Sequence, residues 1–230
     1  MRIEAKDGEA TLWIYDAIGD MFGPDAVTAK GVRDRLAALR GINTLNIRIN
    51  SPGGVVDDAV AIHTLLSEYP AEKVTKIDGV AASAATILIP RDSKVQIASG
   101  AKMMIHNPWG IAVGDYRELA KASEIAKKYA ESAAEMYLAR TGKTSDEVRA
   151  AMDAETWFTG QEAVDFGIAD SSSETPAIEA ATQESVMAKA KLVAQLAFAA
   201  MVAGEPEQRQ ATFNSIRRAA VALARARGVA

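Results

Sequence analysis

The chain has 230 residues, of which 49% are hydrophobic and 24% charged, and its formal net charge is −4. These values are ordinary for a globular protein and allow one sizeable core plus an appendage. The absence of cysteine excludes disulfides, thiolate metal sites and cysteine nucleophiles. The chain has neither a signal-peptide pattern nor an uncharged apolar run of about 18 residues, so we expect a cytoplasmic protein.

Strand and helix patterns alternate along the first half of the chain. Strands are predicted where β-prone apolar residues run together or alternate, and helices where apolar residues recur every three or four positions. In chain order, we predict a strand at 10–15, a helix at 26–39, a strand at 45–49, a helix at 57–67, a strand at 74–77, a helix at 82–88 and strands at 94–97 and 103–105. This alternation predicts a layered α/β fold.

Helical patterns dominate the remaining sequence. A long helix is predicted over residues 115–140, with Gly142 as its C-cap. A capping-box-like start at residues 144–147 precedes a short helix. Another short helix is predicted over residues 159–166 and ends at Gly167.

The composition changes after residue 170. A polar, turn-rich segment indicates a linker over residues 171–186, so residues 1–170 form the predicted main domain. Residues 187–230 form a predicted alanine-rich helical tail with seven basic and two acidic residues, a net charge of +5, which leaves −9 on the rest of the chain. This asymmetry favours either contact of the tail with an acidic surface or a solvated basic helix.

One serine and one histidine stand in sequence contexts that favour chemistry. Ser83 lies among small residues in the run GVAASAA, which leaves room for a substrate carbonyl to approach its hydroxyl. His106 follows in the run MMIHNP, and a neutral imidazole is the usual acceptor of a serine proton. The pair predicts a peptidase. The other histidine, His63, lies in a predicted helix among apolar neighbours and is expected to be structural.

Four sequence blocks carry a resemblance to a known family. They are NSPGG at 50–54, GVAAS at 79–83, MIHNP at 104–108 and WFTGQEAVDFGIAD at 157–170. In this order and spacing they resemble the signature blocks of the Clp-type serine peptidases, over roughly residues 10–170. The resemblance implies a Clp/crotonase-like layered α/β fold, a ββα superhelix, with the helix at 115–140 as the family's long handle helix.

Other segments resemble the phage-encoded branch of that family, the head maturation or prohead proteases. They are residues 13–19, 27–30 and 155–158. This resemblance implies a serine endopeptidase that processes capsid or scaffold proteins in the host cytoplasm or within a procapsid.

The family resemblance assigns Ser83 as nucleophile and His106 as base. The family's third residue is an aspartate, but Glu155 stands at that position, and glutamate also orients histidine in some unrelated hydrolases. Asp153 is the alternative, since it points to the same side as Glu155 if the segment is extended. The resemblance further implies an oxyanion hole formed by the backbone amide of Gly54 and by that of Ala84. No metal site or phosphate-binding loop is apparent.

The family resemblance also implies an assembly. Clp-type peptidases form rings, usually of six or seven subunits, and two rings stack through their handle helices. The apolar handle residues here are Tyr116, Leu119, Ala126, Tyr129, Ala133, Met136 and Tyr137. An ATPase partner is doubtful because the first predicted strand begins almost at once, leaving little room for a gating loop. We expect no membrane or direct nucleic-acid partner.

Three alternatives to head maturation remain open at this point. The first is a cellular Clp peptidase subunit that works with an ATPase. The second is a crotonase-like acyl-CoA enzyme, against which the pair of Ser83 and His106 argues. The third is an inactive scaffold, if Glu155 fails to support His106.

Overall fold

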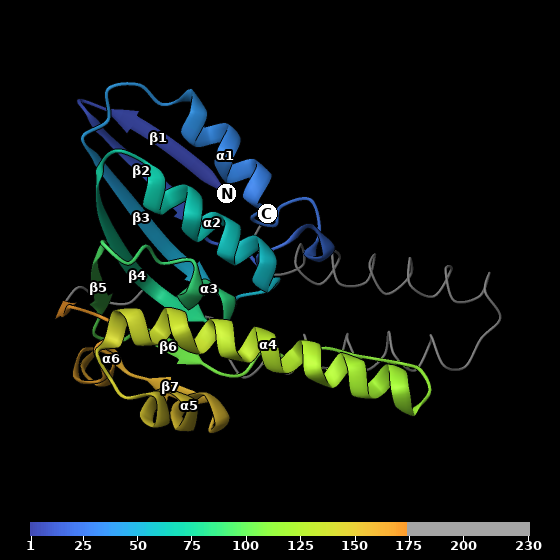
Figure 1. The fold of residues 1–230 in the computed structure, drawn as a ribbon. Coiled ribbons are helices and arrows are strands. Elements are labelled where there is room, and N and C mark those ends of the chain that lie inside the picture. The colour runs from blue at the N-terminus through green and yellow to red at the C-terminus, as the bar shows by residue number, and fades with distance from the viewer. Residues whose placement is uncertain (174–230) are drawn as a thin grey trace.

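In a computed structural model of the protein, the structure describes residues 1–173, and within them the fold is built on one eight-stranded sheet (Figure 1). Its strands are β1 (Arg2–Lys6), β2 (Glu9–Ile14), β3 (Thr44–Ser51), β4 (Glu72–Ala82), β5 (Lys94–Ala98), β6 (Lys102–Ile105), β7 (Thr156–Phe158) and β8 (Ser171–Ser173). The helices are η1 (Asp20–Phe22), α1 (Ala29–Ala38), α2 (Val56–Glu68), α3 (Ala84–Ile87), α4 (Tyr116–Thr141), α5 (Ser145–Asp153) and α6 (Gly160–Phe166). The layered α/β class predicted from the sequence is confirmed.

The central strands are parallel and bury one face under helices. The strand order is β1-β2-β3-β4-β5-β8, and only the β1–β2 and β6–β7 pairs are antiparallel. Leu45, Ile47 and Ile49 of β3 are fully buried, while the residues between them are partly exposed, as strict alternation requires. Helices α1 and α2 lie together on one face of this sheet (Figure 1).

Strand β4 changes partner along its length, and this change creates the site. Its first half pairs with β5, from Val74 to Ile77, and its last residues pair with β6. Ala82 is the partner of Met104, and the amide of Ser83 donates to the Met104 carbonyl at 2.9 Å. The chain that follows β4 therefore leaves the sheet beside the chain that follows β6.

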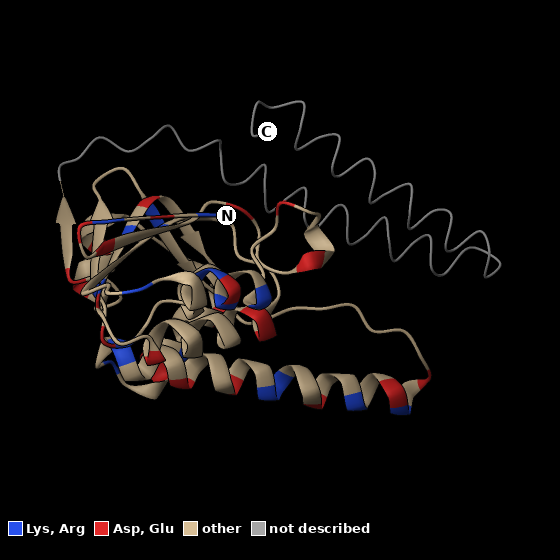
Figure 2. Ribbon diagram, turned by 90° about the horizontal axis from the view of Figure 1, so that it is seen from above, with Lys and Arg blue, Asp and Glu red and all other residues tan. Residues whose placement is uncertain are grey.

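Helix α4 projects from the body of the molecule (Figure 1). Asp115 and Glu118 form a capping box at its start, and Gly142 closes it in the left-handed conformation, as the sequence predicts. Its outer part contains both basic and acidic residues (Figure 2). Ala133 and Tyr137, two of the residues predicted to join subunits, are instead buried within the subunit.

Three of the strands have no clear sequence signal, and two helices start later than predicted. The helix predicted from residue 82 begins at Ala84, because Ala82 is the last residue of β4. The helix predicted from residue 26 begins at Ala29, because Val27 forms a β-bridge with Ile18. Strands β1, β7 and β8 are present in the structure but were not predicted from the sequence. Strand β8 consists of the first three residues of the predicted linker at 171–186, paired with β5; the remainder of that linker and the tail at 187–230 lie outside the described residues. None of the helices within residues 1–173 has the length and hydropathy needed to span a bilayer.

Candidate active site

Ser83 stands at a sharp junction between a strand and a helix. It follows β4 directly, is the N-cap of α3 and has a φ of 55°. A non-glycine residue in this region is strained, and such strain clusters at functional sites. The small neighbours predicted to leave space, Ala82 and Ala84, are both buried. The junction fixes the position of the serine hydroxyl.

His106 reaches that hydroxyl. It follows β6 and is only 7% exposed, and its Nε2 atom lies 2.8 Å from Ser83 Oγ. The distance is that of a strong hydrogen bond, and burial keeps bulk water from competing for it. The structure thus brings together the serine and histidine that the sequence singled out.

Glu155 lies on the other side of the imidazole. Its Oε2 atom is 3.6 Å from His106 Nδ1, and its side chain is 38% exposed. The antiparallel pairing of Ile105 in β6 with Thr156 in β7 brings the two residues opposite each other, because His106 and Glu155 are the next residues in that register. Glu155 has a φ of 49°, so a second site residue occupies the left-handed region.

Asp153, the alternative third residue, has a different contact. It is the last residue of α5, and its Oδ1 atom accepts a hydrogen bond of 2.7 Å from Asn107 Nδ2. The expectation that Asp153 and Glu155 point to the same side assumed an extended segment. That assumption is wrong, because a helix ends at Asp153 and Ala154 is still in the right-handed helical region.

Two glycines give the NSPGG segment close backbone contacts, Gly53 with the serine segment and Gly54 with Ile18. A Cβ atom on Gly53 would lie 2.9 Å from the Ala84 nitrogen and 2.4 Å from the Ala82 carbonyl oxygen. A Cβ atom on Gly54 would lie 2.0 Å from the Ile18 carbonyl oxygen. Only glycine fits this approach at either position. The sequence block contained Gly53, but its contact with the serine segment was not predicted.

The amides of Gly54 and Ala84 are available as donors. Hydrogen bonds from Ile18 to the Gly53 carbonyl and from Val55 to the Ile18 carbonyl flank Gly54, so the Gly54 amide points away from Ile18. Ala84 is the first residue of α3, and the first amides of a helix have no partner within it. Within residues 1–173 neither amide donates to another backbone group, and two such amides near a serine can receive a negative oxygen.

The second histidine lies elsewhere. His63 Nδ1 is 2.9 Å from the Ile89 carbonyl oxygen, so this nitrogen carries the proton. Burial lowers the pKa of His63, which favours the neutral ring. This contact fits the structural role predicted for it.

A serine bonded to a buried histidine, with a carboxylate on the far side of the ring and two amides nearby, defines a serine hydrolase arrangement. Comparison with known proteins specifies the family, because the Clp protease family model matches residues 10–175. The chain belongs to the Clp protease family, and it is therefore a serine-type endopeptidase.

Individual relatives support this assignment. The chain is 33% identical over 137 residues to ATP-dependent Clp protease proteolytic subunit 1 of Leifsonia xyli, covering 59% of this chain and 70% of the relative. It is 32% identical over 126 residues to the protein of the same name from Protochlamydia amoebophila, covering 53% of this chain and 61% of that relative. A ClpP1 point mutant from Listeria monocytogenes has a similar fold, with a TM-score of 0.61 and 23% identity over 72% of this chain and 91% of that chain.

Proposed function

We propose that the protein cleaves peptide bonds through an acyl-enzyme formed on Ser83, with His106 as general base and Glu155 as the residue that orients it. The hydrogen bond of 2.8 Å between Ser83 and His106 carries this proposal. Glu155 rather than Asp153 takes the third role, because Glu155 lies 3.6 Å from the imidazole while Asp153 bonds to Asn107.

The reaction proceeds in two proton-balanced halves. Ser83 Oγ attacks the scissile carbonyl carbon while its proton passes to His106 Nε2. The C–N bond then breaks, His106 gives that proton to the leaving amine, and an ester remains on Ser83. Water attacks the ester and yields its proton to His106. Collapse of the second intermediate returns a proton to Ser83 and releases the new carboxyl terminus.

The amides of Gly54 and Ala84 receive the negative oxygen of both tetrahedral intermediates. Glycine at position 54 allows the main chain to approach the substrate without a Cβ atom. One such donor is worth about 3–4 kcal/mol of transition-state stabilisation.

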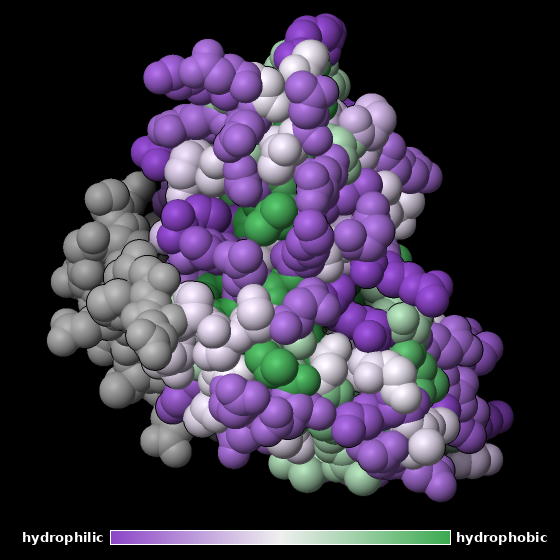
Figure 3. Space-filling view, turned by 90° about the vertical axis from the view of Figure 1, so that its left-hand side faces the viewer, coloured by the Kyte–Doolittle hydropathy of each residue, from purple (hydrophilic) through white to green (hydrophobic). Residues whose placement is uncertain are grey.

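Self-assembly into a ring is the second part of the proposal. Exposed apolar residues recur along residues 107–115 and the first part of α4: Trp109, Ile111, Val113, Tyr116, Leu119 and Ile125. By contrast, the side of the molecule on the left of Figure 1 is largely hydrophilic, and hydrophobic residues are visible there only in small patches (Figure 3). Apolar residues gathered in this way are typical of a surface that another chain covers. We infer that α4 and residues 107–115 contact other copies of this chain.

The proposal also concerns the substrate and the partner that delivers it. The relatives described above are named as proteolytic subunits of ATP-dependent proteases, which favours the role of a Clp proteolytic subunit in the cytoplasm, fed by an ATPase. We therefore propose this role in place of capsid or scaffold processing, which rests on the phage-like segments of the sequence alone. Degradation of a folded protein that requires an added Clp ATPase supports this role. Cleavage of a capsid or scaffold protein without an ATPase supports head maturation instead.

The activity itself is tested with a fluorogenic peptide. The purified protein should cleave it, and Ser83→Ala should abolish cleavage while leaving the assembly intact by light scattering. An acyl-CoA enzyme or an inactive scaffold would give no cleavage. Hydrolysis by Ser83→Ala at the wild-type rate would overturn the proposal.

A further inference from the structure

The carbonyl oxygen of Ser83 accepts two hydrogen bonds from one residue, Thr86. The Thr86 amide donates to the Ser83 oxygen at 2.9 Å, and the Thr86 hydroxyl donates to the same oxygen at 2.6 Å. Because α3 has only four residues, these two bonds account for much of what fixes its first peptide. The orientation of that peptide therefore depends on the Thr86 side chain.

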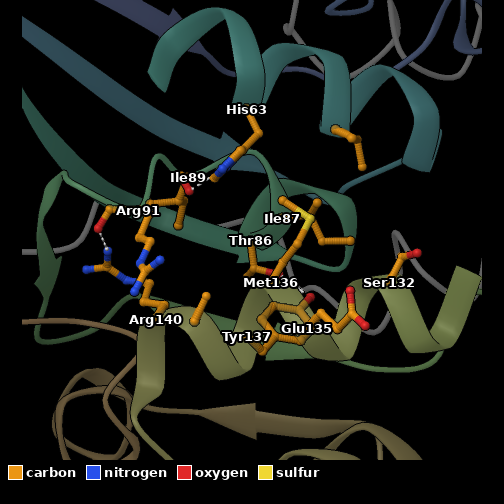
Figure 4. Close-up of a pocket in the computed structure, with 12 residues that line it drawn as sticks. His63, Thr86, Ile87, Ile89, Arg91, Ser132, Glu135, Met136, Tyr137 and Arg140 are labelled. Atoms are coloured by element: carbon orange, nitrogen blue, oxygen red, sulfur yellow. Dashed lines mark hydrogen bonds between the residues drawn. The ribbon is translucent and has the colours of Figure 1, made fainter. Parts of the chain in front are cut away.

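A buried tyrosine from the projecting helix extends this contact. Tyr137 of α4 points its hydroxyl at Thr86, with 2.7 Å between the two oxygens (Figure 4). Thr86 has one hydroxyl proton and uses it on the Ser83 carbonyl, so Tyr137 must be the donor to Thr86. Burial raises the pKa of Tyr137 and keeps the phenol protonated. The hydrogen bonds thus run in one direction, from Tyr137 through Thr86 to Ser83.

The Ser83 carbonyl and the Ala84 amide belong to the same peptide group. In a trans peptide the C=O and N–H bonds point in opposite directions within one plane, so bonds that fix the carbonyl also aim the amide. Donors to the carbonyl oxygen also polarise the peptide, which makes its N–H a stronger donor.

We propose that Thr86 and Tyr137 are positioning residues that aim and polarise the Ala84 amide of the oxyanion hole. This inference rests on the proposed peptidase function. Both side chains also border a cavity of about 340 Å³ between α2, α3 and α4, so the turn has room to shift when the contact is broken (Figure 4). This link, the hydrogen bonds from Tyr137 through Thr86 to Ser83, couples the first turn after the nucleophile to the helix that we expect to join subunits.

Substitutions that remove single hydroxyl groups test the inference. Thr86→Val deletes both the donor to Ser83 and the acceptor for Tyr137, while Thr86→Ser keeps the hydroxyl. Tyr137→Phe removes one oxygen from the far end of the link. Thr64→Val is the matched control, because the Thr64 hydroxyl likewise bonds a backbone carbonyl, that of Val60, on an exposed part of α2.

We expect Thr86→Val to lower kcat roughly tenfold at unchanged KM, below the roughly 100- to 1,000-fold cost of deleting a whole oxyanion donor. Tyr137→Phe should give a smaller loss of about threefold, and the double variant should be no slower than Thr86→Val because the groups act in series. Thr86→Ser should recover most of the activity. A peptide boronate, whose tetrahedral adduct occupies the oxyanion hole, should lose affinity for Thr86→Val in step with kcat.

A structural role alone predicts a different pattern. If Thr86 had only a structural role, Thr86→Val would lower the fraction of Ser83 that a fluorophosphonate titrates. The kcat per titrated site and the boronate affinity would then be unchanged. That result, or equal kcat values for Thr86→Val and Thr64→Val, would overturn the inference. If Thr86→Val does not fold, Tyr137→Phe decides by the same two measurements. An inactive wild-type protein would instead refute the proposed function.

Discussion

The Oε2 atom of Glu155 lies 3.6 Å from Nδ1 of His106, on the side of the ring opposite the bond to Ser83. The glutamate reaches this position because α5 ends two residues earlier and the chain turns through a left-handed conformation at Glu155 itself. A residue one methylene longer than the family's aspartate is thus accommodated by the path of the backbone.

This contact predicts a loss of activity in Glu155→Gln. An amide no longer stabilises the imidazolium and can favour the wrong tautomer, a change that costs about 10⁴ in kcat where the contact is tight. At this longer distance we expect Glu155→Gln to lower kcat for peptide hydrolysis about 100-fold. Asp153→Asn is the matched control and should retain near wild-type kcat. The reverse ranking of the two variants would transfer the third role to Asp153.

Gly54→Ala should destabilise the fold and abolish activity. Its φ is 151°, and the added methyl carbon would lie 2.0 Å from the Ile18 carbonyl oxygen. Gly41→Ala isolates the cost of backbone conformation, because Gly41 has a φ of 63° but no neighbour within 4 Å of an added Cβ. By urea denaturation, Gly41→Ala should cost about 1–2 kcal/mol and Gly54→Ala clearly more. Equal losses would contradict the close approach described for Gly54.

A cluster of three residues on the sheet predicts how stability changes at alkaline pH. Burial, followed by the hydrogen bond of 2.6 Å to the Asp78 carboxylate, raises the pKa of Tyr15 to about 12. Arg48 also bonds Asp78 and acts in the opposite direction on Tyr15. Between about pH 10 and 12 the unfolded chain loses the phenol proton while the folded chain keeps it, so stability falls as pH rises through this window.

Tyr15→Phe should remove that contribution. The variant should be less stable than the wild type at neutral pH, and its free energy of unfolding should decline less steeply between pH 10 and 12. Urea denaturation at several pH values measures both. Parallel curves for the two proteins would show that Tyr15 titrates normally in the folded state.

Ile125→Glu should disrupt the assembly. Ile125 is 47% exposed on the projecting part of α4, and a carboxylate placed in a covered apolar contact carries a large desolvation cost. Light scattering should report a smaller particle than for the wild type. Lys121→Glu, which also adds a carboxylate to an exposed position of α4, should change the mass much less. An unchanged mass for Ile125→Glu would remove this part of α4 from the interface.

Local patterns in the sequence predict most of the fold and part of the site. The alternation over residues 45–49 identifies a strand with one buried face, and the motifs around Ser83 and His106 identify the reacting pair. Strand β8 is not predictable in this way, because three serines acquire strand structure only by pairing with β5. The choice between Asp153 and Glu155 depends on where a helix ends, and the contact of Thr86 with Tyr137 joins residues 51 positions apart.

In the proposed mechanism, His106 activates the Ser83 hydroxyl. A fluorophosphonate probe followed by peptide mapping tests it directly, because the probe reacts with an activated serine and leaves an adduct on it. We predict one adduct per chain, located on Ser83, with a rate that falls sharply in His106→Ala. An unlabelled Ser83 in the assembled protein, or labelling that is as fast in His106→Ala as in the wild type, would show that His106 does not activate Ser83.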